Sequence, residues 1–576
     1  MSEPALREEG KPQDRYDVSI VGGGLAGLTL AIQLKRARPE TSVFVAEKRR
    51  GPAPEAAFKV GESTVEMSAH YFADVVGMKD HLDAEQLEKA GLRFFFPAGD
   101  NSDISKRVEW GAVALPPVPS YQVDRGRFEN ALAERAMELG ADFFDDAKVD
   151  AIELGDGEHK ITVTREGETT EVTSTWLVDA SGRYQLVKKM LGLEKDVDHT
   201  INSAWLRLAN GIDIEEWVDD EAWFERMQER GVRKLSTNHL MGEGYWVWLI
   251  PLSSGSISIG IVADPRFHPY EEIKTLDAAI DWLQRHEPQL AAEIDSRRDD
   301  IEDFLKVENF AYSCQRVFSP ERWALTGIAG VFADPFYSPG SDFIAQANTY
   351  ITDMVTRDLS GEDVRRRALS FNAAYISAFE TAVRGTYNDH YQLFGNAQVM
   401  TAKLLWEFAA YWATVALPFF RGKLTDLDFP KQVQGDVRRI FGIGGRIEQL
   451  FRDWHGLGQR DWRDAFIANR SFEGFWEMHL DLGRELDDDA LKRRIAENAD
   501  LLEGVAVVIF HKAVEMLPNN DLDESTKINP AAISLSPENW EKDGLFDDEK
   551  GLSLSEARSR APGLENMMLD EIVQPV

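Results

Sequence analysis

The sequence predicts an α/β (α+β) protein with a Rossmann-like domain, a second β-sheet laid over it and a mainly helical C-terminal region. Three observations support this fold class. A β-rich run ends in a glycine-rich turn that is followed by helical spacing, strand-like segments dominate residues 204–262, and amphipathic helical spacing dominates beyond about residue 365. The chain has 576 residues, too many for one simple core, so two or three packed units are expected.

The expected boundaries follow from changes in composition along the chain. The predicted units are a disordered lead at 1–15, a core at 16–365 whose second sheet spans about 200–315, a helical domain at 366–518 and an acidic tail at 519–576. The tail is rich in Pro and Ser, and we expect it to be only partly ordered.

The net charge restricts the partners of the protein. It is −35, from 99 acidic and 64 basic side chains, so the surface should repel nucleic acid and anionic membranes. A single cysteine, Cys314, excludes an internal disulfide framework and suits a reducing cytoplasm. Residues 1–15 lack the apolar core of a secretory signal. The apolar stretch 404–420 is short and contains Glu407, which favours a buried helix over a membrane anchor.

The first elements form a βαβ unit. We expect a strand at 16–21, a helix at 28–37 and a strand at 42–47. Between the first two lie Gly22, Gly24 and Gly27, spaced as G-x-G-x-x-G. In a dinucleotide fold the first permits a tight turn, the second lets a pyrophosphate approach the backbone, and the third allows close helix–strand packing. Glu47, about 20 residues past the last glycine, is placed to accept a ribose hydroxyl.

The next elements extend the first domain and build the second sheet. The expected elements are a helix at 127–139, strands at 149–154, 161–164, 176–179, 245–251 and 256–261, a return to the first domain at 323–330, and a helix from Ser341 to about Leu359.

Two motifs give the functional indication. Residues 246–251 fit W-x-W-x-I-P, in which Trp246 and Trp248 point to the same side of a strand. Residues 332–340 fit F-x-x-P-x-x-S-x-G. Alone, the first is most often core packing and the second an ordinary Pro-Gly turn before a helix. Together with the dinucleotide fingerprint, they resemble the flavin-dependent halogenases.

This resemblance covers roughly residues 16–359 and implies FAD as the cofactor. Asp179 lies in a segment similar to the D-x-S-G turn of FAD-dependent aromatic hydroxylases, and Asp334-Pro335 resembles the second FAD motif, whose Asp binds the ribityl chain. Arg125 lies in a segment whose arginine is near the flavin. Some relatives tether FAD through a carboxylate, for which Asp264 is a candidate.

The second motif also suggests a site for negative charge. Backbone amides and a helix N-terminus come together at Ser338, Pro339, Gly340 and Ser341, with Ser341 as the expected N-cap. Such a site favours a halide or the reduced flavin.

The resemblance also implies the reaction. In the family, FADH2 from a separate flavin reductase, O2 and chloride or bromide give hypohalous acid, which crosses a tunnel to a lysine beside the substrate. Lys59 opens a K-x-G-E-S-T segment that resembles the one carrying this lysine, and partial burial would make its amine accessible. The strand with Trp246 and Trp248 would separate flavin from substrate. No metal is expected.

One departure bears on the substrate. Tryptophan halogenases have a Glu immediately before the Ser of the second motif, where this chain has Tyr337, which we place with Ser338 among the catalytic candidates. The expected substrate is therefore a phenolic, pyrrolic or similarly activated compound of secondary metabolism, such as antibiotic biosynthesis, either free or bound to a carrier protein. An arginine-rich stretch at 438–470 could receive an acidic carrier, although a salt-bridged helix face is the stronger interpretation.

Two alternatives stay open at this point. An FAD-dependent aromatic monooxygenase that hydroxylates its substrate would share the fold, and a flavoprotein without catalysis would share the nucleotide site. The halogenase motifs favour the first function over both.

Overall fold

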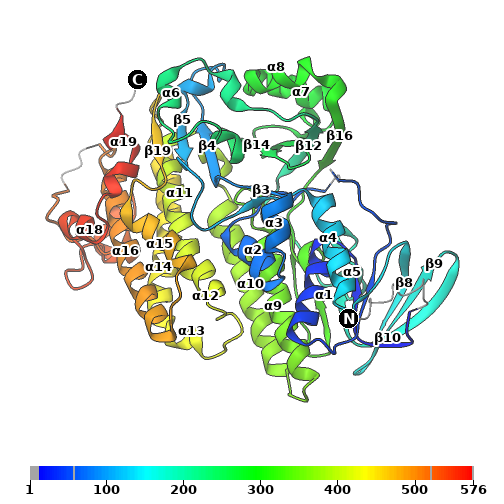
Figure 1. The fold of residues 1–576 in the computed structure, drawn as a ribbon. Coiled ribbons are helices and arrows are strands. Elements are labelled where there is room, and N and C mark those ends of the chain that lie inside the picture. The colour runs from blue at the N-terminus through cyan, green and yellow to red at the C-terminus, as the bar shows by residue number, and fades with distance from the viewer. Residues whose placement is uncertain (1–11, 56–58, 519–521, 574–576) are drawn as a thin grey trace.

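The computed structural model describes residues 12–55, 59–518 and 522–573, in three regions that pack against one another (Figure 1). The nucleotide-binding domain and the second sheet lie one above the other, and the C-terminal helices cover one side of both. Residues 1–11 of the expected disordered lead lie outside the described residues; the first strand begins at Arg15.

The nucleotide-binding domain is built on a seven-stranded sheet. Its order is β7-β2-β1-β10-β9-β8, and β18 pairs with the end of β10. The pairs β1–β2, β1–β10, β2–β7 and β10–β18 are parallel, as in a Rossmann-like sheet, whereas β8, β9 and β10 form an antiparallel extension. The strands are β1 (Arg15–Val21), β2 (Val43–Ala46), β7 (Asp142–Phe144), β8 (Ala147–Leu154), β9 (His159–Arg165), β10 (Glu168–Asp179) and β18 (Trp323–Leu325). Helix α1 (Leu25–Ala37) packs against α4 (Arg125–Glu138) and α9 (Gly340–Asp358).

The second sheet has eight strands in the order β16-β12-β15-β14-β13-β4-β5-β19. The prediction that it spans about residues 200–315 is too narrow, because two strands come from the segment before residue 112 and one from the C-terminal region. The strands are β4 (Leu92–Phe96), β5 (Val108–Gly111), β12 (Asn202–Leu208), β13 (Thr237–Gly242), β14 (Tyr245–Pro251), β15 (Ile257–Ala263), β16 (Ile301–Val307) and β19 (Phe466–Ala468).

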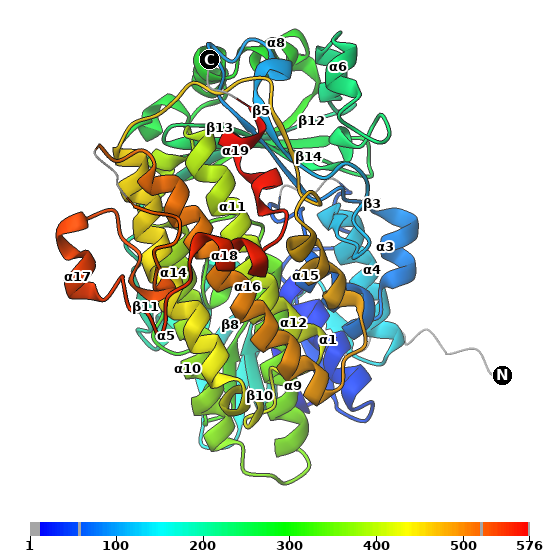
Figure 2. The ribbon, with the colours of Figure 1, turned by 90° about the vertical axis from the view of Figure 1, so that its left-hand side faces the viewer.

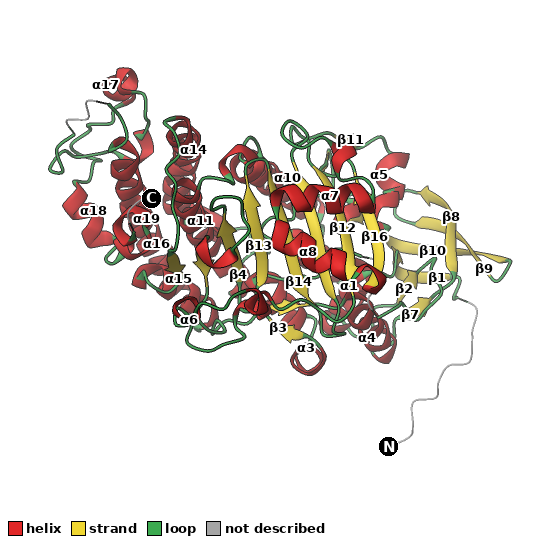
Figure 3. Ribbon diagram, turned by 90° about the horizontal axis from the view of Figure 1, so that it is seen from above, coloured by secondary structure: helices red, strands yellow, loops and turns green. Residues whose placement is uncertain are grey.

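Strand β14 separates two hydrophobic cores because its side chains alternate between the faces of the sheet. Trp246, Trp248 and Ile250 join the large core shared with the nucleotide domain. Tyr245 and Val247 join a smaller core on the other face. Helices α7 (Leu276–His286) and α8 (Pro288–Ser296) lie across that other face (Figure 3).

The C-terminal region is helical, as expected, and its long helices pack side by side (Figure 2). They are α10 (Arg365–Ala382), α11 (Ala397–Tyr411), α14 (Gln434–Gly456), α15 (Glu473–Gly483) and α16 (Asp488–Val514). The apolar stretch 404–420 is buried in this layer. Within the described ranges, no helix combines the length and the apolar character needed to cross a bilayer.

The prediction of a partly ordered acidic tail is wrong for residues 522–573. This segment forms α17 (Trp540–Asp543), α18 (Leu554–Arg560) and α19 (Leu569–Ile572) and packs on α11 and α16. The tail holds apolar side chains that are buried in the structure, among them Ile528, Leu545, Leu564 and Met567. The acidic composition suggested disorder, but burial of these apolar side chains favours an ordered tail.

Candidate active site

The three glycines of the G-x-G-x-x-G turn differ in the space that a side chain would have. Gly22 has φ +115°, and a Cβ there would overlap the carbonyl oxygen of Ala180. A Cβ on Gly27 would overlap the carbonyl oxygen of Gly22. A Cβ on Gly24 would meet only the Lys59 Nζ, at 3.6 Å. The first and third glycines therefore serve packing, while the second leaves open the approach that a pyrophosphate needs. The residues present fit a dinucleotide.

Glu47 fastens this loop to the end of β2. Its Oε2 accepts from the Gly23 amide at 2.9 Å and its Oε1 from the Arg49 amide at 2.9 Å. The carboxylate therefore lies beside the fingerprint, where a ribose hydroxyl was expected. The first turn of α1 carries no acidic residue, so its N-terminus is free to face a phosphate.

Lys59, the expected substrate-side lysine, lies beside the fingerprint loop. Its ammonium contacts Glu129 and lies beside Gly24. Arg125, one helical turn before Glu129 on α4, donates to Glu129 at 2.6 Å and to the Val60 carbonyl at 2.7 Å. Burial lowers the pKa of Lys59. The buried Glu129 draws both cations to the nucleotide loop, a position suited to phosphates.

Asp179 closes the turn after β10. It is completely buried, and its two oxygens accept from the amides of Ser181 at 2.9 Å and Val187 at 2.8 Å. Burial raises the pKa of this carboxyl. The side chain therefore shapes the backbone of the D-x-S-G segment, and any contact with FAD falls to the backbone around it.

Asp334 is turned into the protein. Its Oδ1 accepts from the Phe336 amide at 3.0 Å, and its Oδ2 lies 2.8 Å from the His199 Nε2 and accepts from the Tyr391 hydroxyl at 2.6 Å. Three protein groups thus already contact this carboxylate, which is completely buried. Pro335 follows directly and leads into the aromatic part of the motif.

Asp264 is likewise occupied. The Arg266 guanidinium donates to both of its oxygens, at 2.6 to 3.1 Å, and the Arg266 amide donates to Oδ1 at 2.8 Å. A covalent link to FAD would require Arg266 to release the carboxylate.

The two indoles of β14 lie on the same side, as predicted. Their ring centroids are 5.7 Å apart. The Trp246 Nε1 donates to the Tyr391 hydroxyl at 3.0 Å, and the Trp248 Nε1 donates to the Ser258 Oγ at 3.1 Å. Asp334 thus holds Tyr391, and Tyr391 holds Trp246, so the second motif and the tryptophan strand are physically joined.

The turn of the second motif differs from the prediction at one residue. Ser341 is not the N-cap of α9; the cap is Pro339, and the helix begins at Gly340. The proline ring restricts φ to a value suited to this position, so the helix begins earlier than the serine signal indicates. Ser338 has φ +58°, and its amide donates to the Pro335 carbonyl at 2.8 Å.

Sequence reasoning missed a second lysine, Lys89, which is 1% exposed. Its ammonium donates to the Ser63 Oγ at 2.9 Å and to the Thr64 carbonyl at 2.6 Å, both within the K-x-G-E-S-T segment. Burial lowers the pKa of Lys89 to about 7. The charge of Lys89 helps to lower the pKa of His239 on β13, after the larger effect of burial. The centroid of the His239 ring lies 5.3 Å from that of Trp246. Lys89 comes just before a largely apolar strand, and this could have signalled its burial.

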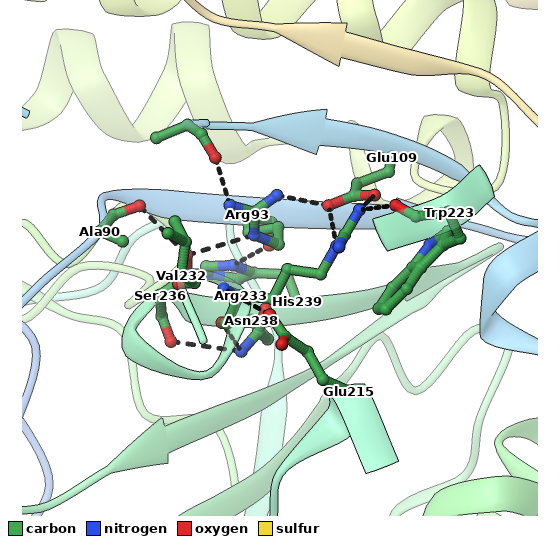
Figure 4. A network of polar contacts seen from close by, with 11 residues as sticks. Ala90, Arg93, Glu109, Glu215, Trp223, Val232, Arg233, Ser236, Asn238 and His239 are labelled. Carbon is green, nitrogen blue, oxygen red and sulfur yellow. Dashed lines mark hydrogen bonds and ion pairs between the residues drawn. The ribbon is translucent and has the colours of Figure 1, made fainter. Parts of the chain in front are cut away.

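A buried ionic network fixes the strands around Lys89 (Figure 4). Glu109 of β5 binds Arg93 of β4 and accepts from Arg233 at 2.8 and 3.0 Å. Ser236 accepts from the Arg93 Nε at 3.2 Å and donates to the carbonyl of Ala90, the residue after Lys89, at 3.1 Å. Removing one member of such a network leaves buried charge uncompensated, which costs about 3–5 kcal/mol.

An aromatic cluster adjoins these strands. The Trp110 ring stacks on Phe408 of α11 at 5.4 Å, and Trp412 lies 4.6 Å from Phe475 of α15. Among the described residues, the Trp110 Nε1, the Trp412 Nε1 and the His479 Nε2 are buried and have no hydrogen-bond partner. The indoles of Trp205, Trp223 and Trp462 share this state, and what distinguishes Trp110 and Trp412 is their place in the aromatic cluster.

Comparisons with known proteins agree with this geometry. Residues 15–257 match the family described as FAD binding domain. Flavin-dependent halogenase chlA of Dictyostelium discoideum is 29% identical over 441 residues, which cover 71% of each chain. The chain is related to the flavin-dependent halogenases. A 1H-pyrrole-2-carbonyl-(peptidyl-carrier protein) chlorinase of Pseudomonas fluorescens is 25% identical over 471 residues, 76% of this chain and 91% of that protein.

A solved structure shows the same fold. Halogenase PltM in complex with phloroglucinol and FAD superposes with a TM-score of 0.60 at 16% identity, covering 90% of this chain and 98% of that one. The predicted α/β fold and FAD cofactor are confirmed, and the relatives favour a halogenase over the hydroxylase alternative.

The arginine-rich stretch of this halogenase relative is largely paired within the chain. Arg439 binds Glu503 at 2.8 Å and Asp500 at 2.5 Å, and Arg446 binds Asp543 at 3.0 Å. For these two residues, the structure therefore agrees with a salt-bridged helix face and not with an open basic patch.

Proposed function

We propose that this protein uses FADH2, O2 and chloride or bromide to halogenate an activated aromatic compound, with Lys89 rather than Lys59 as the amine beside the substrate. The observation that carries this assignment is the complete burial of Lys89 against the K-x-G-E-S-T segment, close to the tryptophan strand. When bound, reduced FAD with O2 would supply the oxidation of halide to hypohalous acid.

The two lysines have different roles in this proposal. Lys59 and Arg125 lie at the fingerprint loop and would neutralise the phosphates of FAD. Lys89 has a pKa of about 7, so near neutral pH a large fraction is free amine. Either form can hold hypohalous acid: the ammonium donates a hydrogen bond, and the amine accepts one or takes the halogen.

The surroundings of Lys89 control what reaches it. Trp246 and Trp248 form a wall of two indoles on the face of the sheet toward the nucleotide domain, which would keep substrate away from the flavin while a small acid passes. Ser338 to Ser341 at the start of α9 are the candidate halide site, with the amides of Gly340 and Ser341 as its donors, because a helix N-terminus favours an anion.

The partners follow from this chemistry. FADH2 would come from a separate flavin reductase. The internal pairing of Arg439 and Arg446 leaves less open positive surface for an acidic carrier protein, which favours a free small substrate, although one of the relatives is named for a carrier-bound pyrrole.

The test supplies FADH2, O2 and bromide with a panel of phenols and pyrroles, and product masses are recorded. The expected product has gained bromine in place of hydrogen, and its formation stops when bromide is omitted. An added oxygen and no halogen across the panel, with or without bromide, would establish the hydroxylase instead.

A further inference from the structure

A buried ionic cluster lies directly behind Tyr337, the residue that replaces the glutamate of tryptophan halogenases. The Tyr337 hydroxyl donates to the Oε2 of Glu407 on α11. Lys403, one turn earlier on α11, donates to the Glu407 Oε1 at 2.6 Å and to the Oε2 of Glu448 on α14 at 3.0 Å. The side chains of Lys403, Glu407 and Glu448 are at most 8% exposed. A carboxylate therefore lies behind this position, but it comes from another helix and contacts the tyrosine hydroxyl.

The far side of the cluster is closed by two further groups. The His390 Nε2 lies 3.5 Å from Glu448, and Arg452 donates to this nitrogen at 2.7 Å. The spacing of His390, Glu407 and Glu448 would allow a metal ion. However, the ammonium of Lys403 already bridges the two carboxylates and Arg452 already uses the imidazole lone pair, so the cluster is equipped to hold protons.

Charge is divided unequally between the two carboxylates. Burial raises the pKa of both, that of Glu448 to about 8. Glu407 has hydrogen bonds from Lys403, Tyr337 and Thr386, which favour its anion. Of the two carboxylates, Glu407 is the one in contact with the Tyr337 hydroxyl and is therefore the one placed to accept its proton.

Tyr337 borders the aromatic cluster with the unpartnered donors. Its ring lies 5.6 Å from Phe408, which stacks on Trp110. The unpartnered Nε1 atoms of Trp110 and Trp412 would be satisfied by oxygen acceptors on an aromatic ring. The Tyr337 hydroxyl and these two indole donors are the polar groups that a planar substrate carrying hydroxyl groups would meet beside this cluster.

We propose that Tyr337, backed by Glu407, removes the hydroxyl proton of a phenolic substrate to activate its ring for halogenation. Tyr337 is the group that meets the substrate, and Glu407 is a positioning residue that acts through it. This inference rests on the halogenase function proposed above and narrows its substrate class to phenols.

The step balances as follows. The substrate O–H proton passes to the Tyr337 oxygen as Tyr337 gives its own proton to Glu407. The phenolate ring carbon forms a bond to the halogen of hypohalous acid, the halogen–oxygen bond breaks, and hydroxide leaves. Loss of the ring C–H proton restores aromaticity, and this proton combines with hydroxide to give water. The product phenolate recovers its proton from Glu407.

The test compares two electron-rich probes, phloroglucinol and 1,3,5-trimethoxybenzene, of which only the first has a hydroxyl proton to lose. Glu407→Gln keeps the shape and the acceptor for Tyr337 but not the basicity. Bromination of phloroglucinol should fall about 100-fold in kcat with little change in KM. Glu407→Gln should brominate 1,3,5-trimethoxybenzene at the wild-type rate.

A second variant protects the test against misfolding of the first. Tyr337→Phe should give the same selective loss, and the double variant should lose no more than either single variant because the two groups act as one unit. The control variant is Tyr375→Phe. It also removes a tyrosine hydroxyl, one that donates to the Phe343 carbonyl at 3.3 Å, and it should leave both bromination rates unchanged.

Three outcomes would overturn the proposal. Equal losses on both probes would show a structural role for Glu407. A wild-type enzyme that forms hypobromous acid, trapped by 2-chlorodimedone, yet brominates no hydroxybenzene would show that phenols are the wrong class. A wild-type enzyme that forms no hypobromous acid with FADH2, O2 and bromide would instead refute the halogenase function on which this proposal rests.

Discussion

The chemistry of single residues is set here by burial. Lys89 and Lys59 are both lysines with lowered pKa values, but their surroundings differ. Lys59 has a carboxylate partner, Glu129, beside the nucleotide loop. Among the described residues, the hydrogen-bond acceptors of Lys89 are a hydroxyl and a carbonyl, those of Ser63 and Thr64, and the carboxyl groups of Glu66 and Asp342 act on it without forming an ion pair. A lysine without an ion-pair partner is costly to bury, and such a cost is typical of functional positions.

This cost leads to a pH-dependent prediction for Lys89→Met. The pKa of Lys89 is about 7 in the folded protein and about 10.5 when unfolded, so between these values the unfolded chain binds the extra proton. Wild-type stability should therefore rise with pH across this window, by up to about 1.4 kcal/mol per unit, and the penalty should be largest below about pH 7.

The measurement is the thermal midpoint of wild type and Lys89→Met across this window. At neutral pH the variant should have the higher thermal midpoint, because it no longer buries a charge. Part of this gain is offset by the loss of two hydrogen bonds, at about 1 kcal/mol each, and the remaining difference should shrink toward pH 10. A variant that is less stable by the same amount at every pH would show that Lys89 is not a buried, destabilised cation.

At the scale of elements, different glycines of the G-x-G-x-x-G turn serve folding and cofactor binding. A methyl group at Gly22 overlaps the Ala180 carbonyl, and φ +115° strains any side chain there. At Gly24, with φ −88°, a methyl group meets only the end of Lys59. Gly22→Ala should therefore lower the thermal midpoint of the protein prepared without FAD, whereas Gly24→Ala should leave that midpoint intact and raise the Kd for FAD about tenfold or more.

Titration of FAD fluorescence and thermal melts of the cofactor-free protein distinguish these two effects. If both variants melted like wild type and bound FAD equally, the loop would not be the nucleotide site.

The elements that the sequence predicts well are those with strong local periodicity. The βαβ unit, β14 and α9 lie within a few residues of their expected bounds because the glycine turn and the alternating tryptophan strand are local signals. Strand pairing across long distances is not local, so β4, β5 and β19 were not assigned to the second sheet. The partners of Lys89 lie up to 26 residues away along the chain, and no spacing rule brings them together.

For the same reason, the sequence predicts the positions of the motif residues but not the partners of their side chains. Asp334 lies where the second motif puts it, but its carboxylate accepts from Tyr391, 57 residues further along the chain, and no local pattern pairs these two residues. Asp264 is different, because its partner Arg266 is only two residues away. The N-terminus of α9 was misplaced because a serine cap signal competed with the proline that starts the helix.

At the scale of the whole molecule, the C-terminal region contributes residues to the proposed active site. Helix α11 supplies Lys403 and Glu407 behind Tyr337 and Phe408 beside Trp110. The tail packs on this helix through α19 and on α16 through α18. We therefore expect that removing residues 522–576 lowers the thermal midpoint by several degrees and reduces halogenation more than FAD binding, because the nucleotide loop lies in another region.

The control for this truncation is removal of residues 1–11 alone, which should change neither property. A truncated protein with wild-type turnover and an unchanged melt would show that the tail is dispensable.

The most direct test of the central claim compares Lys89→Met and Lys59→Met with FADH2, O2 and bromide, scoring trapped hypobromous acid and brominated product separately. We expect Lys89→Met to form hypobromous acid at the wild-type rate and to lose product about 100-fold or more. Lys59→Met should lose both in parallel and recover both at high FAD. Full product formation by Lys89→Met, or loss of product alone by Lys59→Met at saturating FAD, would contradict the assignment of Lys89 as the amine beside the substrate.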